Sequence, residues 1–375
     1  MKDSLKLKQI WAALISIDGF GPKTFFQLKD QLKKNQIGWH EFWVKPWLVL
    51  PKTSRSEKIL LSIKKFKREQ GLSRYWHQLK LDQVSVVCWD DPAFPPLLKE
   101  IDSPPPVLFY RGDFSLCQQR PVAVVGTRQM TSYGRMVAEK IGRELAYHQA
   151  TVVSGFMYGI DVTAQQAALA GGGQTVGILA FGFDHMLPTR HKPIFDQFLE
   201  QGACFITEYA PHVPPNKGTF RQRNRLVAGL SLGVVVVEAA VKSGTQLTVD
   251  YALDYGRDVF AIPGSINNPY SEGTRMMLNK GAQLVVSGQE VVDGLTLKKW
   301  FGRASPSKKI NQTELGLKPI PAKIFQAIQL DQLTTDQLAS CLDLKLSFSG
   351  LLAELTSLEI QGLIRKEAGK WTALW

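Results

Sequence analysis

Short apolar runs rich in β-branched residues alternate with helix-length segments over the middle of this 375-residue chain. Parallel strands need long crossover connections, usually helices, so this alternation indicates a parallel sheet with helices on both faces. We therefore predict an α/β fold with a doubly wound, mainly parallel sheet. The predicted strands are residues 121–126, 151–154, 174–180, 203–207, 233–238, 258–262 and 282–286.

The chain is too long for one compact core, and it divides by pattern. Residues 1–83 have helical spacing, and Gly19, Gly21 and Pro22 suit a tight hairpin between two helices. This indicates a helix-hairpin-helix (SAM-like) module that receives a DNA phosphate, although a plain helix pair without a DNA role is the alternative. Residues 84–297 are the predicted Rossmann-like DNA-binding domain.

Residues 298–318 are polar, basic and contain Pro and Ser, which predicts a linker. Residues 319–375 predict three helices and a β-hairpin, the plan of a winged-helix domain. Its recognition helix would carry Glu354 and Glu359, which repel phosphates. We therefore favour a protein-interaction or packing role for this module.

Positive charge is concentrated at particular places in the chain. The net charge of +12 comes from +10 in residues 1–83 and +5 in 298–318, whereas 84–297 carry −2 and 319–375 carry −1. This distribution suggests a polyanionic partner near the N-terminal third and the linker, with a solubilising lysine surface as the alternative.

Several classes of protein find no support in the sequence. No apolar run is long enough to span a membrane, and the polar N-terminus does not resemble a signal peptide. The four cysteines lie far apart, without the spacing of a metal site, and suit a reducing compartment. We expect a cytoplasmic protein without a metal.

Ligands of doubly wound folds bind beyond the carboxyl ends of the strands, where this chain places glycines, hydroxyls and basic residues. Lysine and arginine can neutralise successive phosphates, and a neighbouring phenylalanine offers a face on which a base can stack. We interpret Lys217–Arg225 as a strand-end loop of this kind. The predicted DNA- or phosphate-binding residues are Gly126, Thr127, Arg128, Ser154, Gly155, Lys217, Phe220, Arg221, Arg223, Asn224, Arg225, Ser243, Gly244 and Thr245.

Nucleotide-cofactor and catalytic patterns are missing from the sequence. No strand is followed by G-x-G-x-x-G, and there is no G-x-x-x-x-G-K-[ST], so no cofactor is expected. We interpret His185 and His191 as surface residues, and Asp161 and Glu238 as residues that cap or brace loops. We therefore predict that the chain is not an enzyme.

Taken together, five groups of residues resemble the DNA-processing protein DprA/Smf family, and the resemblance covers about residues 90–290. Residues 94–98 and 104–112 are similar to the segment that leads into the family's domain. The five groups are Gly126-Thr127-Arg128, Ser154-Gly155 with Gly159-Ile160-Asp161, Arg223-Asn224-Arg225 with residues 228–231, Glu238-Ala239 with Ser243-Gly244-Thr245, and residues 259–265.

The resemblance implies a non-catalytic protein that binds and protects incoming single-stranded DNA during natural transformation. It also implies a homodimer that loads a RecA-type recombinase. By position, Arg128 resembles the family's phosphate-binding arginine, and Lys217 and Phe220 resemble its lysine and stacking phenylalanine. Three positions depart from the family pattern: Tyr158 stands where arginine is usual, Gln166 where histidine is common, and Arg221 where proline is frequent.

An alternative function is a Rossmann-like nucleotide N-glycosidase of the cytokinin-activating type, which the Ser243-Gly244-Thr245 loop with Glu238 upstream resembles. Such enzymes need a Gly-Gly-x-Gly-Thr loop followed by a glutamate. The acid in the following segment here is Asp250, which is offset from that pattern.

Overall fold

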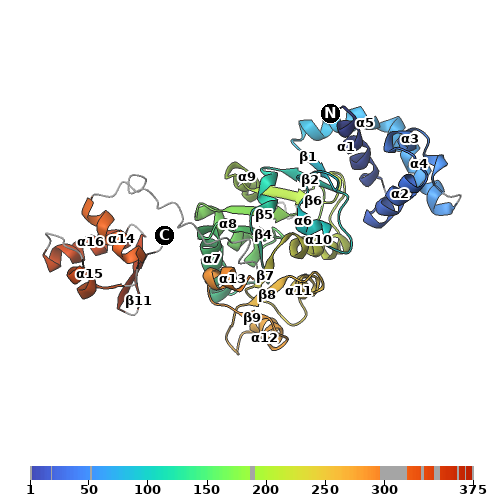
Figure 1. Cartoon of the computed structure of the whole chain (residues 1–375). Helices are drawn as coiled ribbons and strands as arrows, with labels where there is room; N and C mark the ends of the chain where they lie inside the picture. The colour runs from blue at the N-terminus through green and yellow to red at the C-terminus, as the bar shows by residue number, and fades with distance from the viewer. Residues whose placement is uncertain are drawn as a thin grey trace. The chain divides into compact units, whose positions relative to one another are not determined.

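The structure is a computed structural model that describes residues 2–17, 19–50, 53–185, 191–295, 319–330, 333–341, 347–360, 363–367 and 369–373. The chain forms two compact units, residues 1–303 and 304–375 (Figure 1). The division falls inside the predicted basic linker, 298–318, which lies outside the described residues. The finer domain boundaries remain predictions.

A sheet with strand order β1-β2-β6-β5-β4-β3-β7-β8-β9 forms the centre of the first unit. The strands from β6 to β9 in this order all pair in parallel, which confirms the predicted mainly parallel sheet. The strands β1 and β2 add an antiparallel edge that we did not predict. The strands are β1 (Ser85–Cys88), β2 (Val107–Arg111), β3 (Pro121–Val125), β4 (Thr151–Ser154), β5 (Gln174–Ile178), β6 (Cys204–Thr207), β7 (Gly233–Val236), β8 (Asp258–Ala261) and β9 (Gln283–Leu284).

Helices cover both faces of this sheet (Figure 1), as expected when parallel strands are buried on both sides. On one face pack α7 (Ser132–Tyr147), α8 (Ile160–Ala170) and α13 (Gly288–Gly294). On the other pack α6 (Pro96–Lys99), α10 (Lys217–Leu230), α11 (Gly244–Asp254) and α12 (Ser271–Asn279). The helix α9 (Lys192–Glu200) packs its phenylalanines with β2 and β6.

Helices precede the sheet, and they share a core with its antiparallel edge. In the turn before α2, Gly19 has a φ of +80°, and Pro22 opens the helix. The assignment of a helix-hairpin-helix module remains a prediction. Lys29 Nζ lies 4.3 Å from the ring centroid of Trp89, just after β1. These elements are α1 (Lys2–Ile15), α2 (Pro22–Lys34), α3 (Trp39–Val44), η1 (Pro46–Leu48), α4 (Ser54–Glu69) and α5 (Gly71–Leu81).

The second unit contains three helices followed by two strands, as predicted, and a short strand between the first two helices that we did not predict. Its core joins apolar residues of the three helices and the strands, and Trp371 Nε1 donates a hydrogen bond of 3.0 Å to Thr335 Oγ1. The elements are α14 (Pro319–Leu330), β10 (Leu333–Thr334), α15 (Thr335–Cys341), α16 (Phe348–Ile360), β11 (Ile364–Glu367) and β12 (Lys370–Ala373), with the antiparallel sheet order β10-β12-β11. Its assignment as a winged helix remains a prediction.

Candidate nucleic-acid interface

The loops that follow β3, β4, β7 and β8 meet at the carboxyl edge of the parallel strands. In the strand order, β4, β5 and β6 lie on one side of β3, whereas β7, β8 and β9 lie on the other. The direction in which the chain adds strands therefore reverses between β3 and β7, and folds of this kind bind ligands at such a topological switch point. Gly126 lies there under tight packing: a Cβ at this position would come within 2.6 Å of Ile160 Cγ1. Packing therefore requires a glycine at Gly126.

Glu238 is buried at the switch point and ties three loops together. Its carboxylate accepts hydrogen bonds from the Thr131 amide at 3.0 Å, the Thr131 hydroxyl at 2.6 Å and Asn268 Nδ2 at 2.9 Å. An internal carboxylate thus occupies the N-terminus of α7, a position that favours anions. The predicted loop-bracing role of Glu238 is confirmed.

The predicted phosphate contacts of Ser154, Gly155 and Arg223 are corrected by the structure, because all three are buried. Ser154 Oγ donates to Val124 O at 2.7 Å, and Arg223 Nη1 donates to Ile178 O at 3.0 Å. A Cβ at Gly155 would lie 1.7 Å from Arg223 Nη1, so this glycine makes room for the guanidinium. Burial lowers the pKa of Arg223 to about 10, and the nearby carboxylate of Asp161 opposes that shift.

Asp161 also braces its loop, as predicted. It is buried, and its carboxylate accepts a hydrogen bond of 3.1 Å from the Gly155 amide. Burial raises the pKa of Asp161, while the positive charge of Arg223 opposes the rise.

The predicted phosphate contact of Arg225 is corrected in the same way. Its guanidinium forms a buried ion pair with Glu208 and also donates to Ser103 O at 2.6 Å. Burial raises the pKa of Glu208, and Arg225 opposes that rise. Arg225 therefore fixes α10 to the lead-in segment and is not accessible to DNA.

The corrections at Arg223 and Arg225 share one cause: residues 217–230 form the helix α10, whereas the sequence suggested a loop over 217–225. Asn216 caps the helix in a reciprocal capping box with Thr219. With 3.6 residues per turn, Lys217 and Arg221 are exposed on one side while Arg223 points into the core.

Four of the predicted residues form an accessible group that we call the basic–aromatic face: Arg128, Lys217, Phe220 and Arg221. Arg128, Lys217 and Arg221 are exposed. The Arg128 guanidinium carbon lies 5.5 Å from the ring centroid of Phe220, within the range of a cation–π contact. Phe220 is half-buried, with its ring 6.4 Å from that of Phe181. Phe220 is therefore anchored in the core and also offers ring surface beside a cation.

The remaining predicted residues border this face or pack beneath it. Asn224 Nδ2 donates to Gly244 O at 3.2 Å, which joins α10 to the first residue of α11. Gly244 is exposed, Ser243 is half-buried and Thr245 is buried. Thr127 Oγ1 accepts from the Gln129 amide at 3.1 Å. Phosphate contacts at this loop remain a prediction.

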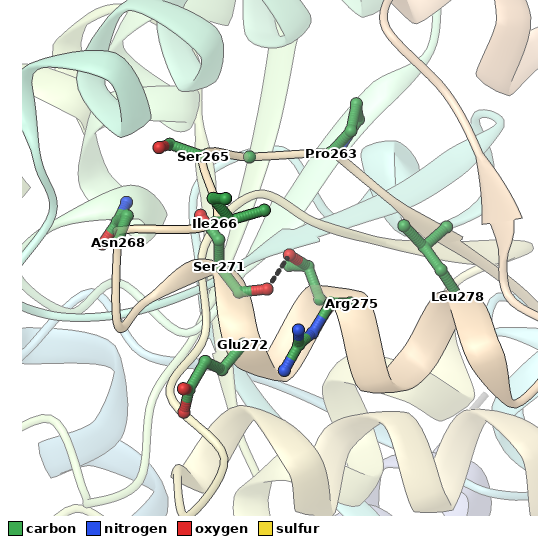
Figure 2. A pocket seen from close by; sticks show the side chains of 10 residues that line it. Pro263, Ser265, Ile266, Asn268, Ser271, Glu272, Arg275 and Leu278 are labelled. Atoms are coloured by element: carbon green, nitrogen blue, oxygen red, sulfur yellow. Dashed lines mark hydrogen bonds between the residues drawn. The ribbon is translucent and has the colours of Figure 1, made fainter.

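A hollow separate from the basic–aromatic face lies between the loop after β8 and α12, with a volume of about 90 Å³. Figure 2 shows Ser265, Asn268 and Ile266 around it. Its charged lining residues, Glu272 and Arg275, have opposite signs. The hollow therefore offers less attraction to a polyanion than the basic–aromatic face does.

The sequence analysis did not identify the roles of two residues near the interface. His191 is fully buried, so its interpretation as a surface residue was wrong; the aromatic residues around it gave no periodic signal. Tyr158 is 41% exposed above it, and only its departure from the family pattern singled it out. His185 bonds through Nε2 with His212 O at 2.8 Å.

The alternative enzyme interpretation gains no residue from the structure. Glu238 is fully engaged by the loops, and Asp250 is exposed and accepts from Gln246 Nε2 at 2.9 Å. Over the described residues, no three His, Cys, Asp or Glu side chains group in a way that could hold a metal ion. None of the helices in the described ranges combines the length and apolar character needed to cross a membrane.

A family model described as DNA recombination-mediator protein A matches residues 85–296, more than half of the chain. The chain belongs to this family. Among curated relatives, Protein Smf of Synechocystis is 32% identical over 324 residues, covering 78% of this chain and 80% of that protein. DNA processing protein DprA of Streptococcus pneumoniae is 40% identical over 202 residues, covering 54% of this chain and 71% of that protein.

Solved structures of the family agree with the fold. The X-ray structure of DprA from Streptococcus pneumoniae matches with a TM-score of 0.66 at 29% identity, covering 77% of this chain and 97% of that one. DprA from Helicobacter pylori matches with a TM-score of 0.51 at 31% identity, covering 56% of this chain and 94% of that one. The structure of the Helicobacter pylori protein is described as showing how that protein binds single-stranded DNA.

Proposed function

We propose that this chain binds single-stranded DNA on its basic–aromatic face. The observation that carries the proposal is the exposed Arg128 guanidinium 5.5 Å from the Phe220 ring, with Lys217 and Arg221 exposed on the same helix. Cations that neutralise phosphates beside an aromatic ring that stacks a base are the usual means of holding a single strand. The single-stranded DNA binding described for the Helicobacter pylori relative supports the same ligand.

A single strand fits this face better than a duplex. Bases in a duplex are already stacked on each other, so a ring such as Phe220 can reach a base only after unstacking it. Residues 84–297 carry a net charge of −2, which does not favour the non-specific attraction by which proteins bind duplex backbones. We therefore assign the strand to a defined site and not to diffuse attraction.

We further propose the family's biological role for this chain. Membership of the DNA recombination-mediator protein A family supports a protein that protects incoming DNA and delivers it to a RecA-type recombinase during natural transformation. In this proposal the protein works in the cytoplasm as a homodimer and does no chemistry of its own. The helix-hairpin-helix module would assist DNA binding, and the winged-helix module would contact protein.

The salt dependence of binding tests the proposed site. Affinity for a fluorescent oligo-dT should fall with rising salt, because the cations release counterions from the phosphates. Arg128→Ala and Lys217→Ala should each weaken binding and flatten the log–log salt plot by about 0.7, the contribution of one phosphate on a single strand. Arg143→Ala, an exposed arginine in the C-terminal half of α7, is the matched control. Binding of both variants that equals wild type at every salt concentration would refute the site.

A further inference from the structure

Tyr158 lies on a strained loop between β4 and α8. Phe156 adopts a φ of +54° and Gly159 a φ of +84°, and the left-handed value is unusual for a phenylalanine. Such a conformation persists only where its surroundings hold it, and strained residues of this kind gather at functional sites. The loop is held by the hydrogen bond from the Gly155 amide to Asp161 and by one of 3.2 Å from the Val162 amide to Met157 O.

The two aromatic residues of the loop differ in their exposure. Phe156 is 1% exposed and packs in a group of aromatic rings. Tyr158, two residues later, is 41% exposed. The rings around Phe156 are those of His191, Phe195, Phe198 and Phe205. The buried ring thus anchors the loop, and the anchored loop presents Tyr158 to solvent.

The Tyr158 ring is held in place but is not covered. The rings of Tyr158 and His191 lie 4.0 Å apart at an interplanar angle of 80°, an edge-to-face arrangement. An edge-to-face neighbour can cover at most one face of the tyrosine ring. Because His191 is fully buried, it provides a fixed support.

The loop that presents Tyr158 lies directly against the loop that presents Arg128. The Ile160 amide donates to Thr127 O at 3.2 Å, and a Cβ on Gly159 would lie 2.7 Å from Arg128 Cα. The Arg128 side chain in turn reaches the ring of Phe220. The Arg128 side chain therefore reaches Phe220, while the Arg128 backbone lies against the loop that carries Tyr158.

We propose that Tyr158 is a second base-stacking platform on the path of the single strand. The inference rests on the proposed function and extends it from one stacked base to two. In a nucleic-acid strand a phosphate separates successive bases, so an aromatic–cation–aromatic order matches base, phosphate and a further base.

Three substitutions separate stacking from a merely structural cover over His191. Tyr158→Phe keeps the ring, Tyr158→Leu keeps an apolar cover without an aromatic face, and Tyr158→Ala removes both. Stacking predicts wild-type affinity for oligo-dT with Phe, and a loss of about fivefold to 150-fold with both Leu and Ala. It also predicts an unchanged salt slope, because no ionic contact is lost. A structural role predicts that Leu restores the affinity, and that result would overturn the inference.

A matched control exists elsewhere on the chain. Tyr147, at the C-terminal end of α7, is 60% exposed and also packs edge-to-face on a histidine, His148, at 5.2 Å. Tyr147→Ala should leave the affinity unchanged. A loss equal to that of Tyr158→Ala would overturn the inference, because it would show a non-specific effect of losing an exposed tyrosine.

The failure of this inference can be told apart from failure of the proposed function. If Arg128→Ala and Phe220→Ala weaken binding while Tyr158→Ala does not, the site stands and the second platform is refuted. If none of the three weakens binding, the proposed site itself is refuted. A 5-iodouracil oligonucleotide bound to the wild-type protein gives a check that needs no variant. Light-induced cross-linking should attach it to the peptide that contains Tyr158, and attachment at Phe220 alone would contradict the second platform.

Discussion

Arg223 and Arg225 show how little a residue's type says about its accessibility. Both lie within the basic run that suggested a phosphate-binding loop, yet each guanidinium binds acceptors inside the protein. Arg128, with no ion pair or hydrogen bond of its side chain in the described structure, lies beside Phe220. The difference is one of position on the helix and the sheet, since all three residues carry the same charge.

Arg225→Ala should destabilise the protein, because it leaves the buried carboxylate of Glu208 without its cation. Breaking a buried ion pair from one side costs about 3–5 kcal/mol. Burial already raises the pKa of Glu208 above its ordinary 4.5, and loss of Arg225 raises it further. A raised folded-state pKa stabilises the fold at low pH, and that contribution is lost as the pH rises. The free energy of unfolding in urea should therefore fall further below that of wild type at about pH 7.5 than at about pH 5.

Arg221→Ala provides the control for this experiment, because Arg221 is exposed on the same helix. Its unfolding free energy should stay within about 0.5 kcal/mol of wild type. If Arg225→Ala instead unfolds like wild type and only loses DNA affinity, Arg225 faces the strand and the buried ion pair is refuted.

At the scale of elements, α10 presents the basic–aromatic face. Its first turn carries Lys217 and Phe220, and its second carries Arg221. The capping box of Asn216 and Thr219 fixes where the helix begins, and hence where these side chains point. Its inner side holds the two buried arginines that attach the helix to the sheet and to the lead-in segment.

Asn216→Ala should therefore weaken stability and binding together. Loss of the cap costs about 0.5–2 kcal/mol, and fraying of the first turn displaces Lys217 and Phe220. Asn216→Ser keeps a capping oxygen and should restore most of both properties. Urea unfolding and oligo-dT affinity measured on the same preparations check this. An Ala variant that is destabilised but binds normally would show that the first turn does not present the ligand site.

The strands β3 and β7 could be predicted because each is a continuous apolar run that is buried on both faces. The helix α10 could not, since its inner side contains arginines in place of the apolar residues that reveal helical spacing. Arg128, Lys217 and Phe220 were identified from chemistry and family resemblance together. Their meeting in space depends on how α10 packs across the sheet, which no local pattern contains.

For the whole molecule, the distribution of charge and the location of the proposed site differ. Residues 1–83 carry a net charge of +10, whereas residues 84–297, which contain the basic–aromatic face, carry −2. Diffuse attraction would place DNA on the N-terminal helices, and a defined site would place it at the ends of the parallel strands. The two explanations predict different effects for the same loss of charge.

Two double variants that remove equal charge decide between them. Arg128→Ala/Lys217→Ala removes two cations of the basic–aromatic face, and Lys64→Ala/Lys65→Ala removes two exposed lysines of α4. Affinity for oligo-dT, measured for both variants at the same salt concentration, is the most direct test. We predict a loss of at least about tenfold for the first variant and less than about twofold for the second. A large loss for the second variant, with wild-type binding by the first, would contradict the defined site.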